Sequence, residues 1–215
     1  MKKSLVLIAV ALMCTMTAFA QDVPKFEVAG GYSYVNFHPG LSQITSQNFN
    51  GGGGAFVYNI TPLIGIKADF MGYAVGTGWT KKLTDAGYPV TGSASGNMFT
   101  YMFGPQFKLH TGRYQPFAEA LFGAAHSNGY GTALYCISGN DSASCNLKNG
   151  NGNNNAFAMA YGGGLDIKMS NRIQLRPVEV DYLYTNFSSN HVAHISNSQN
   201  SFRYFAGVNF TFGGK

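Results

Sequence analysis

The last segment of the chain, NSFRYFAGVNFTFGGK, alternates between an aromatic side and a polar side. Every second residue from Phe202 to Phe212 is apolar, whereas Arg203, Asn209 and Thr211 lie on the opposite side. A period of two residues is typical of a β-strand, because successive side chains of a strand point to opposite faces. The apolar side would pack in the core of a soluble sheet or face lipid in a membrane barrel.

The same alternation recurs in eight segments, and no stretch after Ala20 has a convincing helical period of 3.6 residues. In the seventh segment the alternation slips near Arg176 and Pro177, which predicts a β-bulge there. We therefore expect an all-β domain. The segments are residues 25–37, 50–59, 64–70, 99–109, 116–126, 157–168, 178–184 and 202–212.

The connections between these segments alternate in length. The sequences NITP, HTGRYQ and MSNR predict short turns, and the long polar stretches are residues 36–50, 71–97, 126–155 and 186–201. Strict alternation places all long loops at one end, as in bacterial outer-membrane barrels. The sequence therefore predicts an eight-stranded antiparallel up-and-down transmembrane β-barrel with short periplasmic turns and four long external loops. A soluble extracellular β-sandwich is the structural alternative.

Charged residues decide which side of this barrel faces lipid. A Lys or Arg facing lipid at the middle of a bilayer costs about 2–4 kcal/mol, so ten outward charges would exceed a typical folding free energy of about 5–15 kcal/mol. We therefore expect the aromatic side to face lipid and the charges to form a network in the barrel interior. Its members are Glu27, Lys67, Asp69, Lys108, Glu119, Asp166, Lys168, Glu179, Asp181 and Arg203.

An eight-stranded barrel is just wide enough for its side chains to fill it. Small inward residues, such as Gly104 and Gly162, would leave room for the charged side chains. We expect a packed polar core without a general-diffusion pore. A gated narrow channel for ions or small solutes is the functional alternative.

Residues 1–20 have the plan of a secretory signal peptide, with Lys2 and Lys3 before a short apolar stretch. Cleavage is expected between Ala20 and Gln21, which leaves residues 21–215 as one barrel domain. The oxidising compartment of an exported protein favours a disulfide between Cys136 and Cys145. Charged residues make up only 11% of the chain and the cationic ones are scattered, so the basic pI does not indicate nucleic-acid binding.

The signal peptide, the eight alternating segments, VEVDYLYTNFSS and the closing QNSFRYFAGVNFTFG resemble the small OmpA-like outer-membrane β-barrel proteins. This resemblance implies integration into the outer membrane of a Gram-negative-type bacterium after Sec-type export, with structural support, adhesion or narrow channels as roles. Two features depart from the family. Gly213, Gly214 and Lys215 follow the final aromatic Phe212, and no peptidoglycan-binding domain follows the barrel, so cell-wall anchoring is not expected.

We expect a non-enzymatic protein without cofactor or metal. The expected partners are outer-membrane lipid and lipopolysaccharide, the outer-membrane assembly machinery, and glycans or proteins that meet the loops of a monomer. A lipid A acyl hydrolase is the enzymatic alternative, because the stretch HISN, with His194 and Ser196, resembles a deacylase motif. His191 and His194 have the spacing of metal ligands on a helix, but nothing in this stretch predicts a helix.

Overall fold

The computed structural model describes residues 23–38, 46–75, 90–91, 96–128, 145–146, 153–187 and 198–214, and eight long strands form its body. Two strands of two residues each, β4 (Val90–Thr91) and β7 (Cys145–Asn146), pair in parallel outside that body. Among the described residues, no helix is long and apolar enough to cross a membrane. The eight long strands are β1 (Phe26–Phe37), β2 (Gln47–Asn59), β3 (Ile64–Val75), β5 (Gly96–Lys108), β6 (Tyr114–Asn128), β8 (Asn153–Lys168), β9 (Ile173–Asn186) and β10 (Gln199–Phe212).

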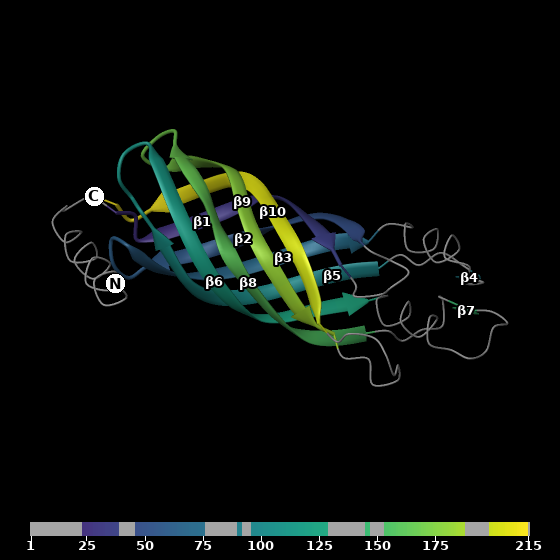
Figure 1. Cartoon of the computed structure of the whole chain (residues 1–215). Coiled ribbons are helices and arrows are strands. Elements are labelled where there is room, and N and C mark those ends of the chain that lie inside the picture. Colours follow the sequence, from purple (N-terminus) through teal and green to yellow (C-terminus); the bar gives the residue numbers. More distant parts are fainter. Residues whose placement is uncertain are drawn as a thin grey trace, which may run out of the picture.

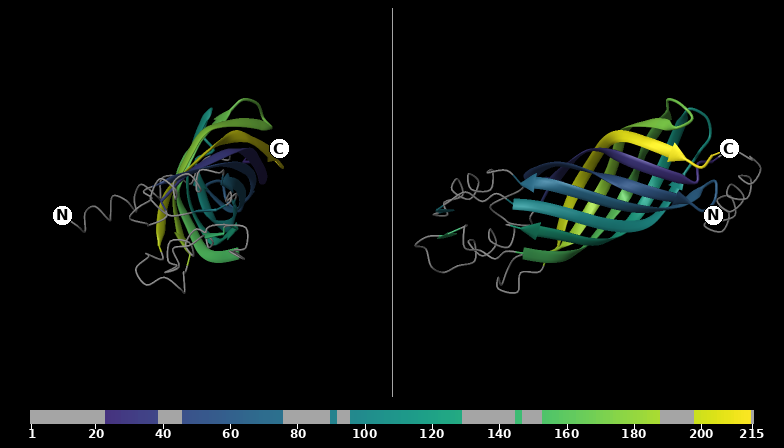
Figure 2. Two further views of the ribbon diagram at one scale, coloured as in Figure 1. Left: turned by 90° about the vertical axis from the view of Figure 1, so that its right-hand side faces the viewer. Right: turned by 180° about the vertical axis from the view of Figure 1, so that it is seen from behind.

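The eight long strands close into one antiparallel barrel in the order β1-β10-β9-β8-β6-β5-β3-β2. Strands that follow each other along the chain are neighbours, and β1 pairs with both β2 and β10. Figure 1 shows the closure, with the purple β1 beside the yellow β10, and Figure 2 shows the barrel from two further sides. The predicted up-and-down barrel is confirmed, and the β-sandwich alternative is wrong because the eight long strands form a single closed sheet.

Three short turns lie at one end of the barrel, here called the turn end, as predicted. In the first turn Thr61 Oγ1 accepts from the backbone N–H of Ile64 at 2.9 Å, and in the third Ser170 Oγ accepts from Ile173 N–H at 3.1 Å. In the second turn Gly112 adopts a φ of 72°, which favours glycine. The long connections join the strands at the opposite end, here called the loop end.

The strands extend further toward the loop end than the sequence pattern predicts. β3 reaches Val75 and β6 reaches Asn128, where long loops were expected from residues 71 and 126 onward. Polar residues continue the ladder in β6, where His126 Nδ1 lies 2.7 Å from Asn155 Oδ1 on the neighbouring strand. In β3 the added residues are apolar, and Met71 and Tyr73 are buried on the inward side. Both cases break the pattern of apolar outward and polar inward residues but not the backbone pairing, so pattern reading places these strand ends too early.

The outer wall of the barrel is apolar and aromatic. Phe202 is 48% exposed and Phe212 is 50% exposed, whereas Arg203 between them is fully buried. The wall also carries Phe70, Phe103 and Tyr161, all exposed on other strands. The predicted orientation is therefore confirmed, with aromatic side chains outward and ionic side chains inward.

A β-bulge interrupts β9 at the position where the alternation slips. Glu179 pairs with Phe205 of β10 and Arg176 pairs with Gly207, so β9 has one more residue than β10 in this interval. The pairing of β9 with β8 shifts at the same place. Because of the extra residue, Pro177 and Val178 are both exposed, and Arg176 and Glu179 are both buried.

Several sequence predictions lie outside the described residues. These are the signal peptide with its cleavage site at Ala20 and Gln21, and the HISN stretch with His194 and Ser196. Cys136 is also outside, and of Cys145 only the backbone is described, so the disulfide stays a prediction.

Candidate functional site

The barrel interior is the candidate functional site, because it collects most of the charged side chains of the described residues. Every long barrel strand except β2 contributes at least one of the charges predicted there. Each strand alternates, so a charged residue that follows an outward aromatic residue points inward. The structure places nine of the ten predicted residues in the interior, each no more than 5% exposed: Glu27, Lys67, Asp69, Lys108, Glu119, Asp166, Glu179, Asp181 and Arg203.

Lys108 organises the part of the interior nearest the turn end. Its Nζ lies 2.6 Å from Glu27 Oε2, 2.7 Å from Asp166 Oδ2 and 2.8 Å from Gln174 Oε1. Asn209 donates a hydrogen bond to Glu27 Oε2 at 2.6 Å. These residues, here called the turn-side cluster, come from β1, β5, β8, β9 and β10, so one ammonium group links strands on several sides of the barrel.

His110 covers the turn-side cluster from the short turn between β5 and β6. Its Nε2 lies 3.1 Å from Glu27 Oε1, and its Nδ1 lies 2.8 Å from the carbonyl oxygen of Pro62 in the neighbouring turn. Asn59 donates to the same carboxylate oxygen of Glu27 at 2.9 Å. The buried carboxylate of Glu27 is therefore held by groups from three directions, and the sequence pattern identified neither His110 nor Asn59.

Lys67 is the first of two cations at the centre of the barrel. Its Nζ lies 2.8 Å from Glu119 Oε1 and 3.1 Å from Glu179 Oε1. In the ring of eight strands, β3 and β9 are four positions apart. The ion pair between Lys67 and Glu179 therefore crosses the full width of the barrel.

Arg203 is the second central cation. Its Nη1 donates to Asp69 Oδ1 at 2.6 Å, and its Nη2 lies 2.7 Å from Asp181 Oδ2. The aspartates lie on β3 and β9, so the planar guanidinium from β10 binds carboxylates on two other strands. Charge-assisted hydrogen bonds of this kind are short and geometrically specific.

Arg176 is an interior cation that the sequence analysis did not include in the network. Its Nε donates to Asp166 Oδ1 at 2.7 Å and its Nη1 to Glu179 Oε2 at 2.7 Å, so it joins the turn-side cluster to the centre. Its guanidinium carbon lies 4.3 Å from the centre of the Phe117 ring. The slip of the alternation hid its inward direction, although counting one extra residue at the bulge would have revealed it.

Lys168 corrects the predicted network, because its side chain is exposed rather than interior. It is the last residue of β8 and lines a groove at the turn end together with Arg113. The barrel wall encloses Asp166, two residues earlier, but ends at Lys168. A long lysine side chain at a strand end reaches water without crossing apolar surface, and so needs no carboxylate partner.

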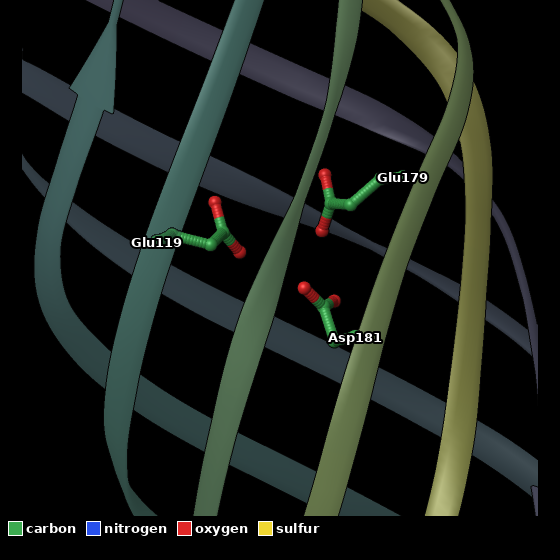
Figure 3. Close-up of side chains that lie close together, drawn as sticks. All are labelled: Glu119, Glu179 and Asp181. Carbon is green, nitrogen blue, oxygen red and sulfur yellow. The ribbon is translucent and has the colours of Figure 1, made fainter.

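Three interior carboxylates lie close enough to be considered as metal ligands. Glu119, Glu179 and Asp181 each offer an oxygen within 4.8 Å of the others, and Figure 3 shows their carboxylates directed toward one another from β6 and β9. Lys67 and Arg203 already supply positive charge to these same groups. The donor set is thus that of an ion-paired cluster, in which a further cation would meet an ammonium and a guanidinium.

Anionic side chains outnumber cationic ones in the interior that the structure describes. Six carboxylates face four lysine and arginine side chains, and each of these ten residues is at least 95% buried. Five buried side-chain oxygens have no hydrogen-bond partner, and four of the five are carboxylate or amide oxygens. They are Asp69 Oδ2, Thr100 Oγ1, Gln106 Oε1, Asp181 Oδ1 and Asn209 Oδ1.

A closed barrel with an apolar outer wall and an ion-paired interior is a transmembrane β-barrel, the only sheet architecture that satisfies its backbone within lipid. The chain belongs to the family described as "Outer membrane protein beta-barrel domain", whose sequence profile matches residues 5–213. It is accordingly an integral protein of the outer membrane.

Solved outer-membrane barrels are similar to this chain at low sequence identity. Neisserial surface protein A is 14% identical with a TM-score of 0.55, and the match covers 87% of this chain and 97% of that chain. Ail, the attachment invasion locus protein of Yersinia pestis, is 12% identical with a TM-score of 0.49, covering 88% and 99%. The N-terminal barrel domain of Pseudomonas aeruginosa OprF is 12% identical with a TM-score of 0.47, covering 88% and 98%. No curated protein matches the chain significantly.

Proposed function

We propose that this protein is a non-enzymatic outer-membrane barrel that supports the membrane and presents its loops to surface ligands, with a packed interior instead of an open pore. The ion pair between Lys67 and Glu179 carries this proposal, since its atoms lie 3.1 Å apart and join strands on opposite sides of the barrel. Arg203 and Asp69, 2.6 Å apart, link β10 to β3 at the same level. Side chains that meet across an eight-stranded barrel leave no continuous column of water.

Conductance across a planar bilayer tests the packed interior. We expect the refolded protein to produce no steady current, because opening would require breaking several buried ion pairs at once. The conductance is compared with that of the double variant Lys67→Ala with Arg203→Ala, which lacks both central cations. Heat-modifiable mobility on a gel must first show that this variant still folds. Steady channels in the unmodified protein would contradict the proposal.

A narrow channel that prefers cations is the second candidate, because six interior carboxylates face four cations among the described residues. Such a channel would open only briefly, when the central ion pairs rearrange. Discrete openings that reverse at a cation-selective potential, and that disappear or change in size in Lys67→Met or Arg203→Met, would favour it over a purely structural role.

The composition of the long connections supports the surface-binding part of the proposal. Residues 126–155 are rich in Asn, Ser and Gly, and residues 186–201 are rich in Asn and Ser, which suits hydrogen bonding to glycans or to polar protein surfaces. A glycan array probed with the protein in nanodiscs tests it. We expect binding that is lost when residues 129–144 are replaced by a short Gly-Asn linker. The absence of binding by the unmodified protein to glycans and to cell-surface proteins would contradict this role.

A lipid hydrolase activity is excluded from the proposal and is tested separately. Purified protein is incubated with lipopolysaccharide, and we expect no release of fatty acid. Release that disappears in Ser196→Ala would overturn the non-enzymatic assignment, whereas release that persists in that variant would indicate a contaminant.

A further inference from the structure

Among the described residues, the exposed charges at the turn end are all positive. All six acidic residues that the structure describes are buried in the interior. Four of the described lysines and arginines are exposed, and all four lie at the turn end: Lys25, Arg113, Lys168 and Arg172. Exposed positive charge without neighbouring carboxylates attracts anionic ligands or anionic lipid surfaces.

Two of these cations, Arg113 and Lys168, line the same groove. They precede β6 and end β8, and the backbone N–H of Lys168 donates to the carbonyl oxygen of Arg113 at 2.8 Å. Like charges on directly opposed positions of neighbouring strands repel each other. An anion held between the two side chains removes this repulsion, whereas the described exposed surface offers no carboxylate for that purpose.

The groove between the second and third turns has room for a polar headgroup. It is open to solvent, has a volume of about 770 Å³ and is also lined by Ser170 and Asn171, whose side chains can hydrogen-bond to a phosphate or a glycerol hydroxyl. Gly112 at φ 72° forms one side, where no side chain fills the space.

Apolar side chains beside the groove indicate that its ligand is amphiphilic. Met169 lines the groove and is 58% exposed, and Tyr114, next to Arg113, is 61% exposed on the outer wall. Ile173, at the start of β9, is also exposed on this wall. A headgroup bound between Arg113 and Lys168 could therefore extend acyl chains along the wall that faces lipid.

We propose that this groove binds the headgroup of an anionic phospholipid in the leaflet at the turn end. The two cations bind the phosphate, the polar side chains of the third turn contact the rest of the headgroup, and the acyl chains lie against Tyr114 and Ile173. The apolar wall beside the groove favours a lipid over a free anion, which would gain nothing from it.

The test uses the full chain refolded in octyl glucoside micelles and follows backbone amide NMR shifts of residues 110–114 and 168–173. The probes are dihexanoylphosphatidylglycerol, dihexanoylphosphatidylcholine and inorganic phosphate. We expect saturable shifts with the phosphatidylglycerol and much weaker ones with the phosphatidylcholine. Each basic residue contributes about fivefold to binding at an anionic surface, so Arg113→Gln with Lys168→Gln should weaken binding at least about tenfold.

Lys25→Gln is the matched control, since it removes one positive charge from the same end but from the residue before β1, and β1 lies across the ring from β6 and β8. Binding should change less than twofold in this variant. A loss of affinity in Lys25→Gln equal to that in Lys168→Gln would overturn the proposal in favour of diffuse electrostatic attraction. Binding of the phosphatidylcholine as tight as that of the phosphatidylglycerol would overturn it in favour of binding that does not depend on headgroup charge. Inorganic phosphate that binds as tightly as the lipid, without shifts at Tyr114 and Ile173, would overturn the lipid assignment. If the double variant fails to fold, Lys168→Gln alone must weaken binding about fivefold.

Discussion

Arg203 illustrates how much a single interior side chain contributes to this barrel. It is fully buried, yet it lies within 2.7 Å of carboxylate oxygens of both Asp69 and Asp181. Removing one member of a buried ion pair leaves its partner desolvated without a countercharge, at a cost of about 3–5 kcal/mol. The arrangement as a whole contributes less to stability than any one deletion suggests, because all its members lost their hydration on folding.

Arg203→Met should therefore lower the free energy of unfolding by about 3–5 kcal/mol, since both aspartates remain buried without a cation. Urea titration in phosphatidylcholine vesicles measures this. Lys168→Met is the control, because its exposed side chain should change the stability by no more than about 0.5 kcal/mol. Equal losses in the two variants would mean that Arg203 is not buried among carboxylates.

Gly31 is required where β1 and β10 approach closely. A Cβ at this position would clash with the carbonyl oxygen of Ala206 and lie 2.6 Å from the Cα of Gly207. Gly31→Ala should lower the stability by about 1–3 kcal/mol, as overpacking does. At the neighbouring Gly30, the nearest atom to a Cβ is 3.9 Å away, so Gly30→Ala should be neutral or slightly stabilising. Thermal unfolding of the two variants makes the comparison, and a reversed order would contradict this packing.

The bulge in β9 shows how one extra residue changes which side chains an element buries. Without it, strict alternation from Glu179 would direct Arg176 outward. With it, Arg176 binds Asp166 and Glu179 at 2.7 Å each. The bulge therefore brings Gln174 and Arg176, at the base of β9, into the interior network.

Deleting Pro177 should reverse the facing of residues 173–176 and direct Arg176 toward lipid. A lipid-facing arginine costs about 2–4 kcal/mol at mid-membrane, and Asp166 would also lose a partner. We expect the deletion variant to lose heat-modifiable mobility at urea concentrations that the parent protein tolerates. Pro177→Ala keeps the residue count and should fold like the parent. A deletion variant as stable as Pro177→Ala would show that the extra residue does not determine the facing.

The barrel wall is stabilised on both of its sides, by lipid outside and by ion pairs inside. Lipid solvates the aromatic outer side, and ion pairs compensate the inner side. Closure leaves no free edge among the eight long strands, since β1 pairs with β10 over eleven residue pairs.

The lipid exposure of the outer wall predicts that the cost of an outward charge depends on its depth. Phe103 is 66% exposed near the middle of β5, so Phe103→Lys should lower stability in vesicles by about 2–4 kcal/mol. Phe107, near the turn end, should tolerate Lys at a cost of about 0–1 kcal/mol. Urea titration of both variants gives the comparison, with Phe103→Leu as a control for lost aromatic area. Equal costs at the two depths would contradict a membrane-spanning wall.

The sequence pattern predicted the strands and the direction of their side chains well. It predicted less well which residues at a strand end, at the bulge or in a turn belong to the interior network. Lys67 and Asp166 lie within strands of regular alternation, and their inward direction followed from the pattern. Lys168 is on the same side of the pattern but at a strand end, where alternation does not reveal that the wall stops. Arg176 comes just before the bulge in β9, whose position was predicted but whose effect on the direction of this side chain was not. His110 lies in a turn, where no periodicity constrains a side chain.

The sequence alone determined that this chain closes a charged side inward and turns an aromatic side to lipid. That choice is local, because it depends on a period of two residues and on the cost of a charge in hydrocarbon. Only the tertiary structure decided which charges meet. Lys67 and Glu179 are 112 residues apart, and their contact at 3.1 Å depends on strand register, on the bulge in β9 and on closure of the ring. These properties belong to the whole set of strand pairings, so no single segment of sequence contains them.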